Sequence, residues 1–185
     1  MDHFIASDAY QTLTKERQRF IRTFREKLRD RGESLPLGDR TGVVSPFAFA
    51  LAELLVNHGA DVEPVVPVVR IIPQVRKQAD LVFSIANTRW VVEIKTAIEF
   101  NSLGAAVLEA VALRKVEPNS KYMLVGLYSK DSAGHHAQAV LDHCDMSEVF
   151  DFVAILSRNN IKGDAWNYNF AEGLTTFLER IPIPR

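Results

Sequence analysis

Apolar residues recur every three to four positions in two segments of the N-terminal third. Between Tyr10 and Arg31 they fall on one arc of a helix of period ~3.6. The residues on this arc are Leu13, Phe20, Ile21, Phe24 and Leu28. A second helix is predicted from Pro46 to His58, with Ser45 as its N-cap and Gly59 as its stop. The segment GESLPLGDRTG between the two helices is predicted to be a loop.

Runs of β-branched and aromatic residues predict five strands. They are EPVVPVVRIIP, in which Pro67 indicates an edge position or a bulge, ADLVFSIA, RWVVEIKT, KYMLVGLYS and VFDFVAILS. The second and third strands are predicted to form a hairpin with its turn at Asn87 and Thr88. Helices are predicted over residues 101–116, capped by Asn101 or Ser102, about 132–144 and about 171–180. This order predicts an α/β fold of three layers, α/β/α, with a central mixed sheet.

Length and composition set limits on the class of protein. The 185 residues are enough for one domain with one substantial core, so a single domain is expected over residues 1–185. Cys144 is the only cysteine, which excludes an intrachain disulfide and a four-cysteine zinc site and fits a reducing cytoplasm. The sequence has no apolar signal core and no run of ~20 apolar residues, so we expect a cytoplasmic protein without a membrane segment.

Charge is distributed unevenly, although the formal net charge is only −1. Between Lys15 and Arg31 eight Lys or Arg residues stand against three acidic residues, a local excess of five (8 − 3). Five of the basic residues fall on the arc opposite the apolar one, and we call them the basic ridge: Lys15, Arg19, Arg22, Arg25 and Arg29. This ridge is either a solvated helix face or a surface that contacts nucleic-acid phosphates.

Three charged residues interrupt the two apolar strands of the predicted hairpin. Asp80 lies near the start of the first strand, and Glu93 and Lys95 lie in the second, where residues two apart share a face. A two-residue turn at Asn87 and Thr88 sets Asp80 opposite Lys95 and makes Asp80 and Glu93 diagonal neighbours. Their Cβ atoms are then expected roughly 6–8 Å apart, a separation that two carboxylates can close onto one divalent cation.

The chemistry of this cluster has two interpretations. Oxygen ligands without a nearby His or Cys favour Mg²⁺, with Mn²⁺ as a substitute, and such an ion supports phosphodiester hydrolysis. Lys95 could then orient the attacking water, lower its pKa, or neutralise charge on the phosphorus. The alternative is a cross-strand salt-bridge cluster on a solvated sheet face.

With Glu93-Ile94-Lys95 thirteen residues after Asp80, on a hairpin followed by a helix, the sequence resembles the PD-(D/E)xK nuclease superfamily. The order helix, three strands, helix, strand over residues 46–129 is similar to that superfamily's core. The resemblance implies that Asp80, Glu93 and the Ile94 carbonyl are metal ligands and that Lys95 is the catalytic lysine. It also makes Glu53, on the preceding helix, a candidate active-site residue, because some branches of the superfamily place an acidic residue there; its alternative is an exposed helical carboxylate. The sequence departs from the motif at Ala79, where the superfamily's proline would stand.

These observations predict a Mg²⁺-dependent endonuclease that acts on double-stranded DNA, of the type II restriction kind, and forms a homodimer. The alternatives are a structure-selective or repair nuclease, such as a junction resolvase, and an inactive nuclease-fold module that binds DNA. Residues 1–45 would supply the basic ridge, 46–129 the catalytic core, and 130–185 an extension of the sheet and the C-terminal helix.

Two further groups of residues were weighed as sites. The spacing of His135, His136, His143 and Cys144 matches no common zinc site, so these residues are predicted to be incidental on a helix. Trp166, Tyr168 and Phe170 alternate with polar residues and are either a base-stacking platform or a strand packed on the core. Core packing is the favoured interpretation.

Overall fold

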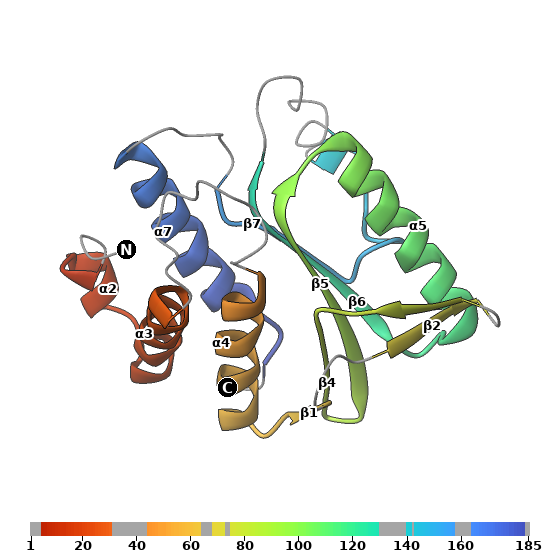
Figure 1. Ribbon diagram of the computed structural model, residues 1–185, viewed down its shortest axis with the longest axis horizontal. Coiled ribbons are helices and arrows are strands. Elements are labelled where there is room, and N and C mark those ends of the chain that lie inside the picture. Colours follow the sequence, from red (N-terminus) through yellow and green to blue (C-terminus); the bar gives the residue numbers. More distant parts are fainter. Residues whose placement is uncertain are drawn as a thin grey trace.

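A five-stranded mixed sheet forms the middle of the protein (Figure 1). The computed structural model describes residues 5–30, 44–63, 68–72, 75–129, 140–141, 143–157 and 164–183. The strand order is β1-β4-β5-β6-β7, formed by β1 (Asp61–Val62), β4 (Leu81–Ile85), β5 (Thr88–Ile98), β6 (Lys121–Ser129) and β7 (Phe152–Ile155). The pairs β1–β4 and β4–β5 are antiparallel, and β5–β6 and β6–β7 are parallel. The predicted α/β class with a central mixed sheet is confirmed.

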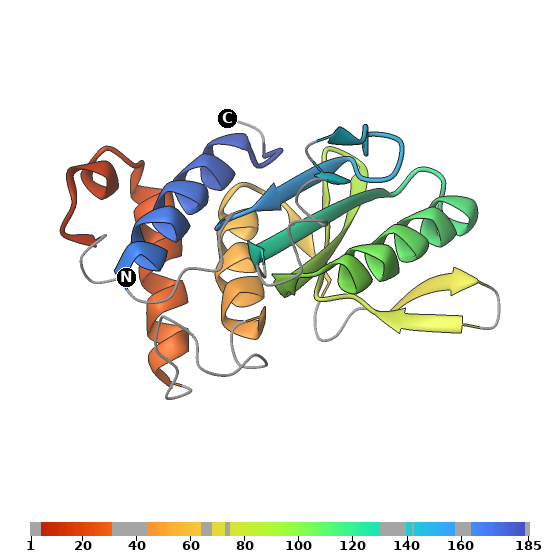
Figure 2. The ribbon, with the colours of Figure 1, turned by 90° about the horizontal axis from the view of Figure 1, so that it is seen from above.

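Helices cover both faces of this sheet, as Figure 2 shows. Helix α5 (Phe100–Val116) lies on one face, while α4 (Val44–Asn57), α3 (Lys15–Asp30) and α7 (Asp164–Arg180) lie on the other. Each face buries its own apolar cluster, because successive residues of β4, β5 and β6 point alternately to the two sides. The three-layer arrangement follows from this alternation.

The N-terminal helices differ from the prediction at their starts. A separate short helix, α2 (Asp8–Gln11), precedes α3, because the Thr14 hydroxyl accepts the Arg17 N–H at 3.4 Å at the start of α3. The prediction of one continuous helix from Tyr10 was therefore wrong. Helix α4 begins at Val44, so Ser45 lies inside it and is not its N-cap. The apolar arc of α3 is buried as predicted.

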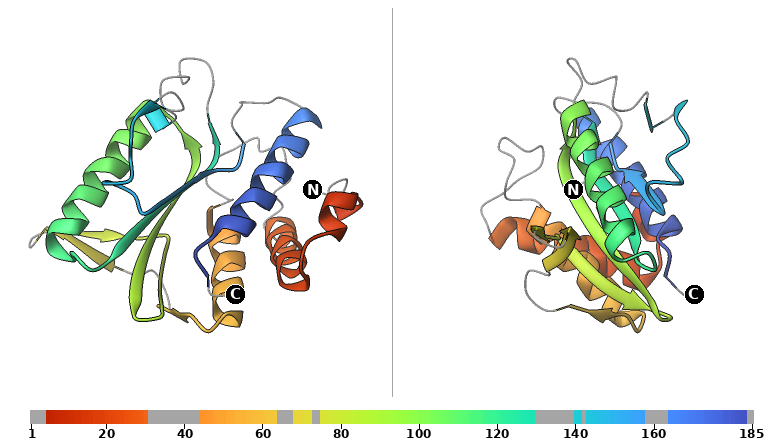
Figure 3. Two further views of the ribbon diagram at one scale, coloured as in Figure 1. Left: turned by 180° about the vertical axis from the view of Figure 1, so that it is seen from behind. Right: turned by 90° about the vertical axis from the view of Figure 1, so that its right-hand side faces the viewer.

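The first predicted strand, residues 63–73, is not a strand of the main sheet. Among its described residues, β2 (Val68–Ile72) forms, and it pairs antiparallel with β3 (Val75–Gln78), which the sequence pattern did not predict. Prolines at positions 64, 67 and 73 interrupt this segment and supply no N–H for a continuous ladder. Pro67 itself lies outside the described residues. The hairpin of β2 and β3 packs beside α5 (Figure 3).

The C-terminal helix is longer than predicted. Helix α7 begins at Asp164 and includes the segment AWNYNF, so this segment is neither a strand nor a flat stacking platform. Phe170 packs on Phe24 in the core, with ring centroids 6.2 Å apart, whereas the side chains of Trp166 and Tyr168 lie outside the described residues. Helix α7 approaches the sheet closely, because a Cβ at Gly173 would lie 1.7 Å from the Leu156 carbonyl oxygen.

Other predicted elements are confirmed in part. Strand β6 spans the whole of KYMLVGLYS and is largely buried, and helix α5 starts at Phe100 with Glu99 as its N-cap rather than Asn101 or Ser102. Most of the helix predicted over 132–144 lies outside the described residues, though residues 140, 141 and 143 are helical. No helix in the described part of the chain has the length and apolar character needed to span a bilayer.

Candidate active site

The turn between β4 and β5 fixes which residues meet across the hairpin. It is made by Ala86 and Asn87, whose φ angles are +49° and +63°, as a type I′ turn requires at both central positions. Thr88 is β-branched and unsuited to positive φ, so it pairs with Ile85 as the first residue of β5. The predicted turn at Asn87 and Thr88 was therefore wrong by one residue.

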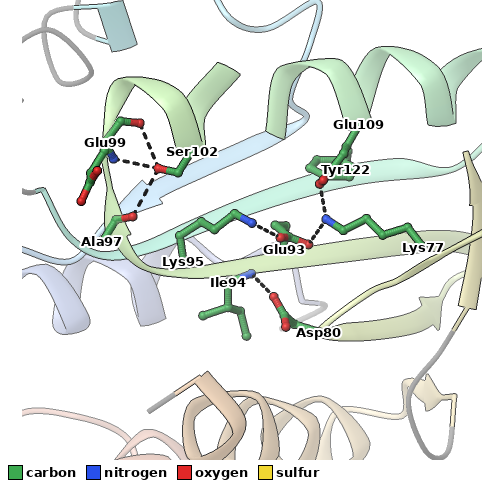
Figure 4. Close-up of polar contacts among 10 residues, drawn as sticks. All are labelled: Lys77, Asp80, Glu93, Ile94, Lys95, Ala97, Glu99, Ser102, Glu109 and Tyr122. Carbon is green, nitrogen blue, oxygen red and sulfur yellow. Dashed lines mark hydrogen bonds and ion pairs between the residues drawn. The ribbon is translucent and has the colours of Figure 1, made fainter. Parts of the chain in front are cut away.

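This turn shifts the register of the whole hairpin. Leu81 pairs with Val92, so the register continues to place Asp80 opposite Glu93, and the predicted pairing of Asp80 with Lys95 was wrong. The shift moves each partner by two positions, and an even shift keeps the same residues on the same face. Glu93 and Lys95 consequently point to the side of the sheet that α5 covers, as Figure 4 shows.

Asp80 lies just before β4 and bonds to the backbone of β5 with its side chain. Its Oδ2 accepts the N–H of Ile94 at 2.7 Å. The carboxylate thereby takes a hydrogen bond at the edge of β5, one position before the first residue of β4. It points to this amide rather than to Glu93, and Figure 4 shows the β5 ribbon between the two acidic side chains. The two carboxylates therefore flank β5.

Glu93 is the centre of a network of ion pairs. Its side chain is only 7% exposed, and each of its oxygens meets an ammonium group. Oε1 pairs with Lys95, two residues along β5, and Oε2 pairs with Lys77 of β3 at 2.7 Å. Lys77 also pairs with Glu109 of α5, and the Tyr122 hydroxyl donates to Oε2 of Glu109 at 3.3 Å. Residues of β5, β3, α5 and β6 thus form one network, in which Lys95 and Lys77 contact Glu93 directly and Glu109 and Tyr122 are linked to it through Lys77 (Figure 4).

Burial and charge shift the proton affinities of this cluster. Desolvation, followed by the charge of Glu93, raises the pKa of Asp80 to about 6. Burial lowers the pKa of Lys95, but the hydrogen bond and charge of Glu93 together with Glu109 outweigh it, so the net shift is upward. Burial and the charges of Glu93 and Glu109 also raise the pKa of Tyr122. Lys95 therefore stays a cation and Tyr122 stays a neutral donor.

A small open pocket adjoins this network. Its polar wall consists of Lys77, Glu93 and Glu109, and its apolar lining consists of Ala79, Val91, Leu113 and Tyr122. The pocket lies on the α5 side of Glu93. Asp80 does not line it, in agreement with the position of this carboxylate at the other side of β5.

Two sequence candidates lie apart from this network. Glu53 of α4 pairs with Arg19 of α3 and accepts a hydrogen bond from the Thr23 hydroxyl at 3.2 Å, so its carboxylate is turned to α3. Lys15, Arg19, Arg22 and Arg29 of the basic ridge are exposed and Arg25 is partly buried. The ridge belongs to the helical layer on the far side of the sheet from α5 (Figure 1). Within one protomer the fold does not bring the ridge beside Glu93.

Three residues of the network were not identified from sequence. Glu109 carried a signal, because it is the one acidic residue in the apolar run LGAAVLEAVAL. Lys77 lies in a segment without strand periodicity, and Tyr122 lies in a strand whose pattern indicates only burial. Of the weighed zinc candidates, His143 and Cys144 are exposed, and His135 and His136 lie outside the described residues.

Comparisons with known proteins give a distant similarity. No family model and no curated protein matches the sequence. The similar solved structures include the restriction endonuclease PspGI in complex with its substrate DNA, at 16% identity and a TM-score of 0.41. The match covers 76% of this chain and 51% of the PspGI chain, so this chain matches about half of that protein. At this level the similarity establishes neither the family nor the activity.

Because the pKa of Asp80 is raised in the folded state, we predict that ionisation of this carboxyl lowers the free energy of unfolding. The folded pKa of about 6 exceeds the unfolded value of ~3.9, so the folded state loses stability as pH rises from about 4 to 6. We expect Asp80→Asn, which keeps an acceptor for the Ile94 N–H, to be more stable than wild type at pH 8 by on the order of 1–3 kcal/mol. Near pH 4 the difference should disappear.

Denaturant unfolding in EDTA at both pH values measures this difference. The control is Asp61→Asn, which alters an exposed carboxylate of β1 and should have the same small effect at both. An equal stability difference for Asp80→Asn at pH 4 and pH 8 would contradict the assignment of a raised pKa to Asp80.

Proposed function

We propose that this protein is a Mg²⁺-dependent endonuclease that hydrolyses phosphodiester bonds in DNA. The observation that supports it most is the environment of Glu93, a nearly buried carboxylate whose two oxygens are each bound to a cationic group. Asp80 lies just before β4, and its carboxylate accepts the Ile94 N–H of the strand that carries Glu93. A salt-bridge cluster on a solvated face would not require this burial.

The donor set fits a hard divalent cation. Asp80, Glu93 and the Ile94 carbonyl offer oxygen only, which favours Mg²⁺ or Mn²⁺ over zinc. Charge fits as well, because the desolvation and Glu93 charge that raise the Asp80 pKa would both be offset by a nearby cation. In the described part of the chain no group of three or more His, Cys, Asp or Glu is arranged as a metal site. The proposed site therefore rests on two carboxylates and a backbone carbonyl.

In this proposal, a bound Mg²⁺ would polarise a phosphoryl oxygen and make a water molecule easier to ionise. Glu93 would hold it on the α5 side of β5, and Asp80 would join as a ligand by turning from the Ile94 N–H toward Glu93. Lys95 is a cation at neutral pH, so it would not act as a general base. Its ammonium would instead orient the attacking water and stabilise the negative charge that develops on the phosphoryl oxygens.

Double-stranded DNA is the proposed substrate, and the exposed arginines of the basic ridge are proposed phosphate contacts. A type II restriction endonuclease is the form of this activity that we propose first. A structure-selective or repair nuclease would use the same site on junctions or damaged DNA. An inactive DNA-binding module would lack any metal-dependent strand scission, which the following experiment tests.

Cleavage of supercoiled plasmid DNA in Mg²⁺ tests the proposal. Wild type should nick or linearise the plasmid, and Glu93→Gln should lose at least ~100-fold in rate because it removes a charged ligand without opening a cavity. Lys95→Met should lose a similar factor through lost charge stabilisation. The matched control is Glu117→Gln, which alters a partly buried carboxylate paired with Arg89 and should cut at the wild-type rate.

Thermal melts would establish that each variant is folded. Absence of cleavage by wild type on plasmid, junction and single-stranded DNA alike, in both Mg²⁺ and Mn²⁺, would refute the enzyme assignment. Equal rates for wild type and Glu93→Gln would place the active site elsewhere.

Lys77 occupies a position where it competes with a cation for Glu93. In EDTA, Lys77→Met should melt at a lower temperature than wild type, because Glu93 and Glu109 each lose an ammonium partner. Mg²⁺ should then raise the melting temperature of Lys77→Met by more than it raises that of wild type, since the ion no longer displaces a lysine. Lys121→Met, on an exposed lysine over the Trp90 ring, is the control. Equal Mg²⁺ shifts in wild type and Lys77→Met would show that Lys77 does not compete at the cation position.

A further inference from the structure

Helix α5 exposes an apolar face to solvent. Leu108 is 72% exposed, Phe100 60% and Val111 40%. At 100° per residue these side chains lie on one side of the helix, the side away from the sheet. The remaining residues of this face are Asn101, Gly104, Ala105, Ala112 and Lys115. A helix that is apolar on its outer as well as its inner side is typical of a buried position.

In the described part of the protomer, nothing around Gly104 requires glycine. It lies inside α5, where glycine costs ~1 kcal/mol relative to alanine. Its φ is not positive, and a Cβ built on it would meet nothing within 4 Å. Glycine at an open position on an apolar helix face is explained by the close approach of a second backbone from outside.

The face is complementary to itself about a centre at Leu108. In an antiparallel pair of α5 helices related by a two-fold axis at this residue, positions equally far before and after it meet. Gly104 then faces Ala112, and Ala105 faces Val111, so small residues surround the central leucine pair. Asn101 and Lys115 each lie seven residues from Leu108, so Lys115 of one copy meets Asn101 of the other. The N-cap residue Glu99 is close to Asn101 in the sequence.

The charges agree with this arrangement. Lys115 is the only charged residue on the face, and the antiparallel pairing places it beside a polar amide and near an acidic residue at the opposite end. A parallel pairing would instead place the two Lys115 side chains together, where like charges repel. We propose that α5 is the contact surface for a second copy of this chain, packed antiparallel and two-fold symmetric about Leu108. This proposal does not depend on the nuclease assignment.

The interface is a single helix face of about four turns, ~25 Å long, which is at the low end for stable protein dimers. A reversible dimer is therefore expected. Sedimentation velocity over a concentration series should show wild type passing from monomer to dimer as concentration rises. Leu108→Glu should remain monomeric at concentrations where wild type is mostly dimeric, because it places two like charges at the two-fold axis.

The matched control is Val56→Glu, which puts the same charge on another exposed apolar residue, 55% exposed, at the end of α4. It should dimerise as wild type does. Thermal melts at protein concentrations too low for dimerisation distinguish a dimer contact from burial of this face by other residues of the same chain. If wild type is monomeric throughout, or if Leu108→Glu dimerises like wild type, the proposal is overturned. A monomeric wild type whose melting temperature falls on Leu108→Glu substitution would show that the chain's own residues cover α5, which also overturns it.

Disulfide trapping tests the centre and direction of the pairing. In a Cys144→Ser background, Leu108→Cys should give covalent dimers on mild oxidation, because the two positions meet at the axis. Phe100→Cys should not, because eight residues on each side of the axis separate the two positions by ~24 Å. Equal trapping at both positions would indicate a parallel pair and contradict the proposed symmetry.

Discussion

The buried carboxylate of Glu93 is the constraint on which the rest of the site depends. A carboxylate that is 7% exposed needs compensating charge, and the fold supplies it from β5 through Lys95 and from β3 through Lys77. Lys77 brings Glu109 of α5 into the same network, and Tyr122 of β6 completes it. The positions of α5 and of the β2–β3 hairpin beside the sheet are thus linked to the charge of one residue.

This arrangement is costly for a purely structural purpose. Replacement of buried ion pairs by apolar residues is often neutral or stabilising, so burial of charge in a small fold calls for a further reason. Asp80 increases the cost, since desolvation and Glu93 raise its pKa to about 6 and its charge destabilises the fold at neutral pH. A divalent cation near Glu93 and Asp80 would relieve both penalties. The burial of Glu93 and the raised pKa of Asp80 thus support the proposed metal site independently of the distant structural similarity to PspGI.

Much of the architecture could be predicted from sequence because its signals are local. The alternation of WVVEIKT places Glu93 and Lys95 on one face, and the continuous apolar run of KYMLVGLYS marks β6 as a strand inside the sheet. The apolar arc of α3 predicted its buried residues. These patterns depend only on the periods of strand and helix, which tertiary contacts did not alter.

The remaining features depend on the exact position of a turn or on tertiary contacts, which the hydrophobic pattern does not give. The turn lies at Ala86 and Asn87, one residue before the predicted position, because of the φ preferences of single residues. This difference alone gives Asp80 a different partner from the predicted one. Within the predicted strand 63–73 the described residues Val68–Ile72 pair instead with β3, which carries Lys77, and the sequence pattern did not show this pairing. Glu109 joins the site only through the packing of α5 on the sheet. The metal-ligand roles of Asp80, Glu93 and Ile94, and the catalytic role of Glu53, stay predictions.

Direct measurement of metal binding tests the central claim that Glu93 is a ligand of a divalent cation. Electron paramagnetic resonance measures the free Mn²⁺ in a titration, and the difference from the total gives the bound Mn²⁺. The measurement needs neither DNA nor catalytic turnover. Wild type at pH 8 should bind Mn²⁺ in a saturable way, Glu93→Gln should lose this binding, and Glu117→Gln should keep it. Mg²⁺ should displace the bound Mn²⁺. Undiminished Mn²⁺ binding by Glu93→Gln, or no saturable binding by wild type, would contradict the account.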